Sequence, residues 1–164
     1  MSRVLIISAT TGSNLILANK IGDLLDLDNE IITLEDFPMP LYTPKVQNID
    51  DASFKSLCEK FIISDGLIFC APEYNGGLPP ILTNAFTWIS VTTANWRDGF
   101  KDKYAVIATR SAGSGQRFLI AFRSQLEYMG TLVMPKTIVV TNTQSLNRKS
   151  AERTLQHLIH LLSK

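Results

Sequence analysis

Five short runs of apolar residues, rich in valine and isoleucine, recur along the chain and are continuous rather than alternating. Such runs are typical of strands that are buried on both faces, as in a parallel sheet. The runs predict strands at residues 4–8, 31–34, 66–70, 104–109 and 137–140.

The segments between and after these runs carry apolar residues at helical spacing. Each segment predicts a helix whose apolar stripe covers one face of the sheet. Strict alternation of strands and helices predicts right-handed crossovers and a doubly wound, three-layer α/β domain. The predicted helices span residues 14–26, 52–64, 80–91, 116–130 and 150–163. Their predicted buried stripes include Leu17, Ile21, Phe54, Phe61, Ile62, Phe86, Phe122 and Leu158.

Length and composition narrow the class of protein. A chain of 164 residues that is 45% hydrophobic and 19% charged predicts one soluble globular domain over residues 1–164. Sixteen basic side chains balance 15 acidic ones, which gives no global attraction to nucleic acid or to an anionic membrane. No apolar run approaches the roughly 18 residues of a membrane span. The apolar start "VLII" is too short for a secretory signal, so we expect a cytoplasmic protein.

The two cysteines fit the same expectation. Cys58 lies on the apolar stripe of a predicted helix, and Cys70 ends a predicted strand. Buried, reduced thiols are favoured over a disulfide. The only histidines, His157 and His160, lie opposite the apolar stripe of the last helix and predict surface residues rather than metal ligands.

Doubly wound sheets bind ligands beyond the carboxyl ends of their strands, near the switch in strand order. The loops after the first, third and fourth predicted strands are therefore the candidates for a site. The loop after the second strand, residues 35–51, is long and holds three prolines, and it is either a rim of the site or a contact with a partner.

The first of these loops reads "SATTGSN", from Ser8 to Asn14, and a predicted helix follows directly. The N–H groups and partial positive charge of a helix start, together with hydroxyl donors, form a phosphate cradle that needs no lysine or arginine. The alternative is a plain helix cap by Ser13 or Asn14. A cap needs one hydroxyl, whereas this loop has four.

The loop after the third strand reads "APEYNGGLPP". Gly76 and Gly77 permit positive φ and a close approach of the backbone to a flat ligand. Pro79 and Pro80 suit the first turn of the next helix. The alternative is a rigid turn with an exposed Glu73 and with the ring of Tyr74 packed on its own helix.

The loop after the fourth strand, "RSAGSGQ" (110–116), is again small and rich in glycine, and it either lines the far side of the same crevice or is a flexible connector. Other motifs are absent from the sequence. "GSGQRF" lacks the third glycine of a dinucleotide fingerprint, no Walker lysine motif occurs, and Ser114 does not form a nucleophile elbow.

Together these loops resemble the NADPH-dependent FMN reductase family of flavodoxin-like proteins. "PEYNGGLPPILTNAFTWIS" (72–90) is similar to its flavin-binding signature, while residues 100–115 and 126–137 are similar to further segments of the family. Two departures stand out. The first loop is shorter than in the family and lacks the arginine that is common there, and Thr87 replaces the aspartate often found before the helix tryptophan, here Trp88.

The resemblance implies a flavodoxin-like five-stranded parallel sheet of order 2-1-3-4-5, with helices on both faces and FMN at its carboxyl edge. It further implies hydride transfer from NADPH or NADH to flavin N5, and electron transfer on to a small acceptor such as a quinone, an azo compound, a metal oxyanion or free flavin. No protein acid, base, nucleophile or metal is needed, because the cofactor carries the chemistry. By position, Thr10, Thr11, Ser13 and Asn14 are the expected phosphate ligands. The full set implied for FMN is Ser8, Thr10, Thr11, Gly12, Ser13, Asn14, Pro72, Glu73, Tyr74, Asn75, Gly76, Ser111, Ala112, Gly113 and Ser114.

Two alternatives remain at this point: a flavodoxin-like electron carrier, and a regulatory relative that has lost the cofactor. The absence of an arginine from the first loop favours each of these alternatives over the enzyme. The choice between NADPH and NADH also stays open, with Arg97, Arg110 and Arg117 as the candidates to meet a 2′-phosphate. The family resemblance implies a homodimer or homotetramer, with Trp88 among the side chains expected on the exposed face of its helix.

Overall fold

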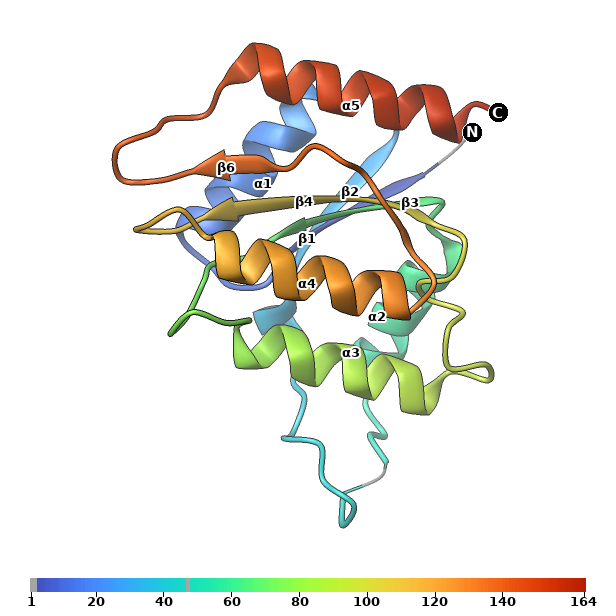
Figure 1. The fold of residues 1–164 in the computed structure, drawn as a ribbon. Helices are drawn as coiled ribbons and strands as arrows, with labels where there is room; N and C mark the ends of the chain where they lie inside the picture. The colour runs from blue at the N-terminus through green and yellow to red at the C-terminus, as the bar shows by residue number, and fades with distance from the viewer. Residues whose placement is uncertain (1–2, 47) are drawn as a thin grey trace.

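A computed structural model describes residues 3–46 and 48–164, and its strands form one parallel sheet (Figure 1). The strand order is β2-β1-β3-β4-β5, with β6 also paired to β4, which confirms the predicted order. The strands are β1 (Val4–Ser8), β2 (Asn29–Thr33), β3 (Gly66–Cys70), β4 (Tyr104–Arg110), β5 (Leu132–Val133) and β6 (Ile138–Val140).

Two short strands share the position beside β4. β5 pairs with the start of β4 and β6 with its end. Ala105 and Ala108 of β4 are three positions apart, whereas their partners Val133 and Ile138 are five positions apart, so two extra residues bulge out between β5 and β6. The predicted fifth strand is β6. β5 was not predicted because two residues are too few to show a pattern.

A guanidinium from helix α4 (Gln116–Tyr128) covers this break in the edge. Arg123 donates hydrogen bonds to the carbonyl oxygens of Val133, at 3.3 Å, and Met134, at 2.7 Å. These bonds satisfy carbonyls at the break and fix the bulge against α4.

Helices cover both faces of the sheet, and each predicted helix is confirmed with ends within two residues. α1 and α5 lie on one face, and α2, α3 and α4 lie on the other (Figure 1). His157 and His160 are exposed on α5, as predicted. No helix in the described part of the chain has the length and apolarity needed to cross a membrane. The remaining bounds are α1 (Ser13–Leu24), α2 (Ala52–Ile63), α3 (Pro80–Thr92) and α5 (Arg148–Leu162).

The two faces of the sheet have different cores. The side under α2, α3 and α4 is aromatic, with the rings of Phe86 and Phe100 4.6 Å apart and those of Phe69 and Phe122 meeting edge to face at 5.1 Å. The side under α1 and α5 is almost wholly aliphatic. The prediction for Ile62 is wrong: its side chain is 42% exposed, since it lies on the flank of the α2 stripe in the last turn.

Both cysteines are free and buried, as predicted. Cys58 lies on the buried side of α2, and Cys70 is the last residue of β3. Burial raises the pKa of each thiol, most strongly for the fully buried Cys70. Both sulfurs therefore stay protonated and unreactive at neutral pH.

Trp88 is buried rather than exposed, so the prediction that it lies on a free face is wrong. Its side chain is 0% exposed, its indole N–H donates to the carbonyl oxygen of Pro40 at 2.7 Å, and the ring of Tyr42 meets it edge-on at 5.1 Å. Asn84 adds two bonds, donating to the Pro40 carbonyl oxygen and accepting from the Tyr42 N–H. Two residues of the flavin-binding signature, Asn84 and Trp88, therefore anchor residues 40–42 onto α3.

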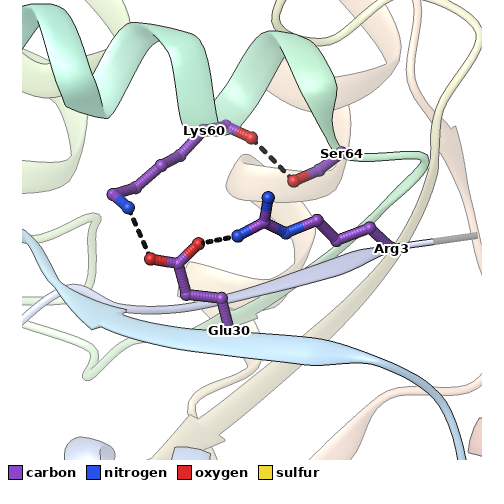
Figure 2. A network of polar contacts seen from close by, with 4 residues as sticks. All are labelled: Arg3, Glu30, Lys60 and Ser64. Atoms are coloured by element: carbon purple, nitrogen blue, oxygen red, sulfur yellow. Dashed lines mark hydrogen bonds and ion pairs between the residues drawn. The ribbon is translucent and has the colours of Figure 1, made fainter.

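A charged cluster at the start of β1 and β2 joins these strands to α2 (Figure 2). The Glu30 carboxylate of β2 accepts from Arg3, just before β1, and from Lys60 of α2, each at 2.5 Å. The Ser64 hydroxyl donates to the Lys60 carbonyl oxygen at 2.6 Å. The cluster joins two neighbouring strands to the helix that covers them.

Candidate functional site

A cleft of about 430 Å³ opens at the carboxyl edge of the sheet. Its walls come from the loops that follow β1, β3, β4 and β6. Carboxyl ends of parallel strands meet at one edge, so loops far apart in sequence border one space. The cleft is lined by Thr10, Thr11, Ser13, Asn14, Pro72, Glu73, Tyr74, Arg110, Ser111, Ala112 and Asn142.

The first loop leads into α1 without a side-chain cap. Gly12 is the residue before the helix, with a φ of 82°, and no side chain accepts a hydrogen bond at this helix start. Ser13 and Asn14 lie within the helix, so the alternative that either acts as a plain cap is wrong. An uncapped helix start leaves first-turn N–H groups for another acceptor, and anions suit this position.

A carboxylate already lies on this loop. The backbone N–H of Thr11 donates to Oε2 of Glu35 at 2.6 Å. Hydrogen bonds from the Thr11 hydroxyl and from its N–H lower the pKa of Glu35. The loop therefore binds an anionic oxygen group through a backbone amide, which is the chemistry that a phosphate would need.

Asn14 joins the first loop to the end of β4. The side chain is 3% exposed. Its amide nitrogen donates to the carbonyl oxygen of Arg110, and its amide oxygen accepts from the N–H of the same residue, both at 2.9 Å. Ser8 has a comparable structural contact, because its buried hydroxyl donates to the carbonyl oxygen of Thr10 at 2.7 Å.

The third loop closes in a tight turn at Tyr74 to Gly77. These two residues exchange backbone hydrogen bonds of 3.1 and 2.9 Å. Positive φ falls on Asn75 (50°) and Gly76 (72°), rather than on Gly76 and Gly77 as expected. Asn-Gly at the centre is typical of a type I′ turn. The ring of Tyr74 lines the cleft and is 48% exposed, so the alternative that packs it away on its own helix is wrong.

Glu73 ties the third and fourth loops together. Its N–H donates to the Ser111 hydroxyl at 2.8 Å, and its carboxylate accepts from the N–H of Phe118, in the first turn of α4, at 3.0 Å. Glu73 is therefore not the free exposed carboxylate of the alternative reading. Ser111 also donates its N–H to the Val140 carbonyl oxygen, so this part of the fourth loop is anchored on both sides.

Six of the predicted residues border the cleft without lining it. Gly12 and the Asn75–Gly76 turn shape the backbone beside it, and Gly113 and Ser114 form the exposed tip of the fourth loop. Ser8 lies beneath the first loop. The structure brings the three predicted loops to one cleft, while the contacts of each residue with a cofactor stay a prediction.

Two residues on the cleft wall are absent from the predicted FMN set. Arg110 ends β4, and its guanidinium donates to the Ser111 carbonyl oxygen at 2.7 Å and to Oδ1 of Asn142 at 2.9 Å. Asn142 follows β6 by two residues. The rule that ligands lie beyond the carboxyl ends of strands pointed to the loop after the last strand as well, and applying it there would have found Asn142.

Comparisons with known proteins agree with this geometry. The family model described as NADPH-dependent FMN reductase matches residues 2–145. The quinone reductase of Escherichia coli is 32% identical over 102 residues, which are 60% of this chain and 53% of the relative. The chain thus aligns with about half the length of that relative.

Two solved structures share the fold. The flavoenzyme NAD(P)H:(acceptor) oxidoreductase FerB from Paracoccus denitrificans superposes with a TM-score of 0.77 at 19% identity, over 99% of this chain and 96% of that one. An oxidoreductase from Corynebacterium diphtheriae gives a TM-score of 0.81 at 19% identity, over 99% and 97%. At this identity the two matches establish the shared architecture alone.

Proposed function

This chain belongs to the NADPH-dependent FMN reductase family, and on that premise we propose that it is an FMN-dependent NAD(P)H oxidoreductase. One observation carries the proposal: the hydroxyl-rich start of α1 and the segment Pro72–Tyr74, which leads into the Asn-Gly turn, line one cleft. The first suits a phosphate, and the second suits the edge of a flat ring.

The donor set fits FMN in two respects. Glu35 shows that the first loop holds an anionic oxygen group, through the backbone amide of Thr11. The first-turn N–H groups of α1 and the hydroxyls of Thr10 and Ser13 would extend this cradle to a phosphate. Pro72 and Tyr74 would flank the ring system, with the fourth loop on its other side.

Bound FMN would accept a hydride from NADPH or NADH and pass electrons to a second substrate. The side chains of the cleft would bind and orient. Glu73 is engaged at the first turn of α4, and the described lining contains no histidine or cysteine. The proposed reaction needs neither, because the cofactor would carry the chemistry. We propose a small acceptor, with a quinone favoured by the similarity to a quinone reductase and an azo compound, a metal oxyanion or free flavin as the other candidates.

The test is a visible absorption spectrum of the purified protein during FMN titration, followed by anaerobic addition of NADPH or NADH. Saturable FMN binding and prompt bleaching of the flavin band are expected. Binding without bleaching would instead identify an electron carrier. If the protein does not bind FMN, it would be identified as a relative of the family that has lost the cofactor.

Glu35→Gln is expected to tighten FMN binding. An incoming phosphate must displace the Glu35 carboxylate from the Thr11 amide, and the lowered pKa keeps that carboxylate charged at neutral pH. Removing one negative charge beside the phosphate makes the free energy of FMN binding more favourable by about 1 kcal/mol. The dissociation constant would then fall about fivefold. Titration of FMN by fluorescence quenching measures it.

Asp36→Asn is the matched control, because it removes a charge of the same sign one residue away on the same short helical turn. Its effect on the FMN dissociation constant should be smaller. Equal effects of the two variants would mean that distant charge matters rather than displacement of Glu35.

A further inference from the structure

We propose that Arg110, at the end of β4, supplies the cationic phosphate ligand that the first loop lacks. The inference rests on the proposed FMN-dependent function and assigns a role within that site. The family resemblance leads one to expect an arginine inside the first loop, and residues 8–14 contain none. The fold instead places Arg110, from the end of β4, on the wall of the cleft that the first loop also lines.

Arg110 carries an uncompensated charge. Its guanidinium donates to two neutral acceptors, the Ser111 carbonyl oxygen at 2.7 Å and Oδ1 of Asn142 at 2.9 Å. Within residues 3–46 and 48–164, the ion pairs found do not include it. A partly buried arginine whose guanidinium has no carboxylate partner is suited to an anionic ligand.

Among the described residues that line the cleft, Arg110 is the only one with a positively charged side chain. The only other charged side chain there, Glu73, has its carboxylate on the first turn of α4. Arg110 thus supplies the positive side-chain charge in the cleft that the first loop also lines.

The backbone of Arg110 is fixed to the first turn of α1. Asn14, the second residue of that helix, bonds both the N–H and the carbonyl oxygen of Arg110. Ser13 and Arg110 also line a second hollow of about 250 Å³ together, on the side of α1 that carries Lys20. The guanidinium and the helix start therefore belong to one rigid unit, and neither has to move far to meet a shared ligand.

The geometry of the guanidinium leaves donors for a phosphate. It has five N–H groups, and the bonds to Ser111 and Asn142 engage Nη1 and Nη2 with one acceptor each. A phosphate monoester carries close to two negative charges near neutral pH. A charge-assisted bond to such a group changes affinity by roughly 10- to 100-fold.

The experiment compares FMN with riboflavin, which has the same ring and no phosphate. Dissociation constants for both flavins are measured by fluorescence quenching with wild type, Arg110→Gln and Arg110→Lys. Arg110→Gln should weaken FMN binding by roughly 10- to 100-fold and leave riboflavin binding unchanged. Arg110→Lys should fall between wild type and Arg110→Gln, because it keeps the charge without the planar fork.

Two further readouts separate a ligand from a structural residue. The salt dependence of FMN affinity should be shallower for Arg110→Gln than for wild type. Lys20→Gln is the matched control, since Lys20 lines the neighbouring hollow and not the cleft, and it should leave FMN affinity unchanged.

Equal losses for FMN and riboflavin in Arg110→Gln would overturn the proposal, because they would show a general loss of the site. Unchanged FMN binding with a lost preference for NADPH over NADH would also overturn it and assign Arg110 to the 2′-phosphate of the nicotinamide cofactor. Failure of the wild-type protein to bind either flavin would instead overturn the proposed function itself.

Discussion

Trp88→Ala is expected to lower the free energy of unfolding by about 3–5 kcal/mol, the range for removing a large buried aromatic side chain. Trp88 is 0% exposed on α3. Its ring meets Tyr42 at 5.1 Å and Phe54 at 6.2 Å between ring centroids, and its N–H holds the Pro40 carbonyl oxygen. The substitution would therefore create a cavity and release the loop at 35–51 together.

Urea denaturation followed by circular dichroism measures the change. Trp96→Ala is the matched control, because Trp96 is 41% exposed. This substitution should lower the free energy of unfolding by less than about 1 kcal/mol. Similar losses at the two positions would contradict the assignment of Trp88 to the core. Trp88→Phe, which keeps a ring and loses the bond to Pro40, should lie between wild type and Trp88→Ala.

Asn14→Leu is expected to lower the free energy of unfolding by about 2–4 kcal/mol, because it removes the partners of two partly buried backbone groups of Arg110. Leucine has a similar size, so the loss would come from the hydrogen bonds rather than from a cavity. Both bonds are 2.9 Å long and join residues 96 positions apart. Thermal or urea unfolding measures the effect.

Asn19→Leu provides the control in the same helix. Asn19 is exposed and donates one hydrogen bond to the Leu15 carbonyl oxygen at 2.9 Å. Its replacement should change stability by less than about 0.5 kcal/mol. Equal effects at positions 14 and 19 would mean that the link between α1 and β4 adds little to stability.

The elements of the fold were predictable because their signals are local. Apolar runs and helical stripes each lie within about a dozen residues, and parallel strands with crossovers then leave few topologies. The loops of the site were predictable for the same reason, since "SATTGSN" and "PEYNGG" each concentrate special residues in one short stretch.

The contacts within the site join residues that are far apart in the chain. The sequence around each residue therefore does not reveal its partner. The family resemblance implies Asn14 as a phosphate ligand, and that role stays a prediction. The bonds of its side chain to the backbone of Arg110 had no signal in the sequence. The sequence predicts Glu73 beside the flavin, with a free exposed carboxylate as the alternative. It gives no sign of the hydrogen bond that this carboxylate accepts from the N–H of Phe118, 45 positions away. Trp88 reads as exposed because it stands outside the apolar stripe of its helix, and contacts with Pro40, Tyr42 and Phe54, all distant in sequence, cover it.

The broken edge beside β4 bears on how copies of this protein can meet. A long exposed edge strand is a template for uncontrolled strand addition and aggregation. Here the edge consists of strands of two and three residues, separated by a bulge that contains Pro135, and Arg123 occupies carbonyls at the break. A strand from another molecule would find no continuous row of partners. Any specific association at this end of the sheet must therefore be built from side chains, and misassembly by strand pairing is disfavoured there from the start.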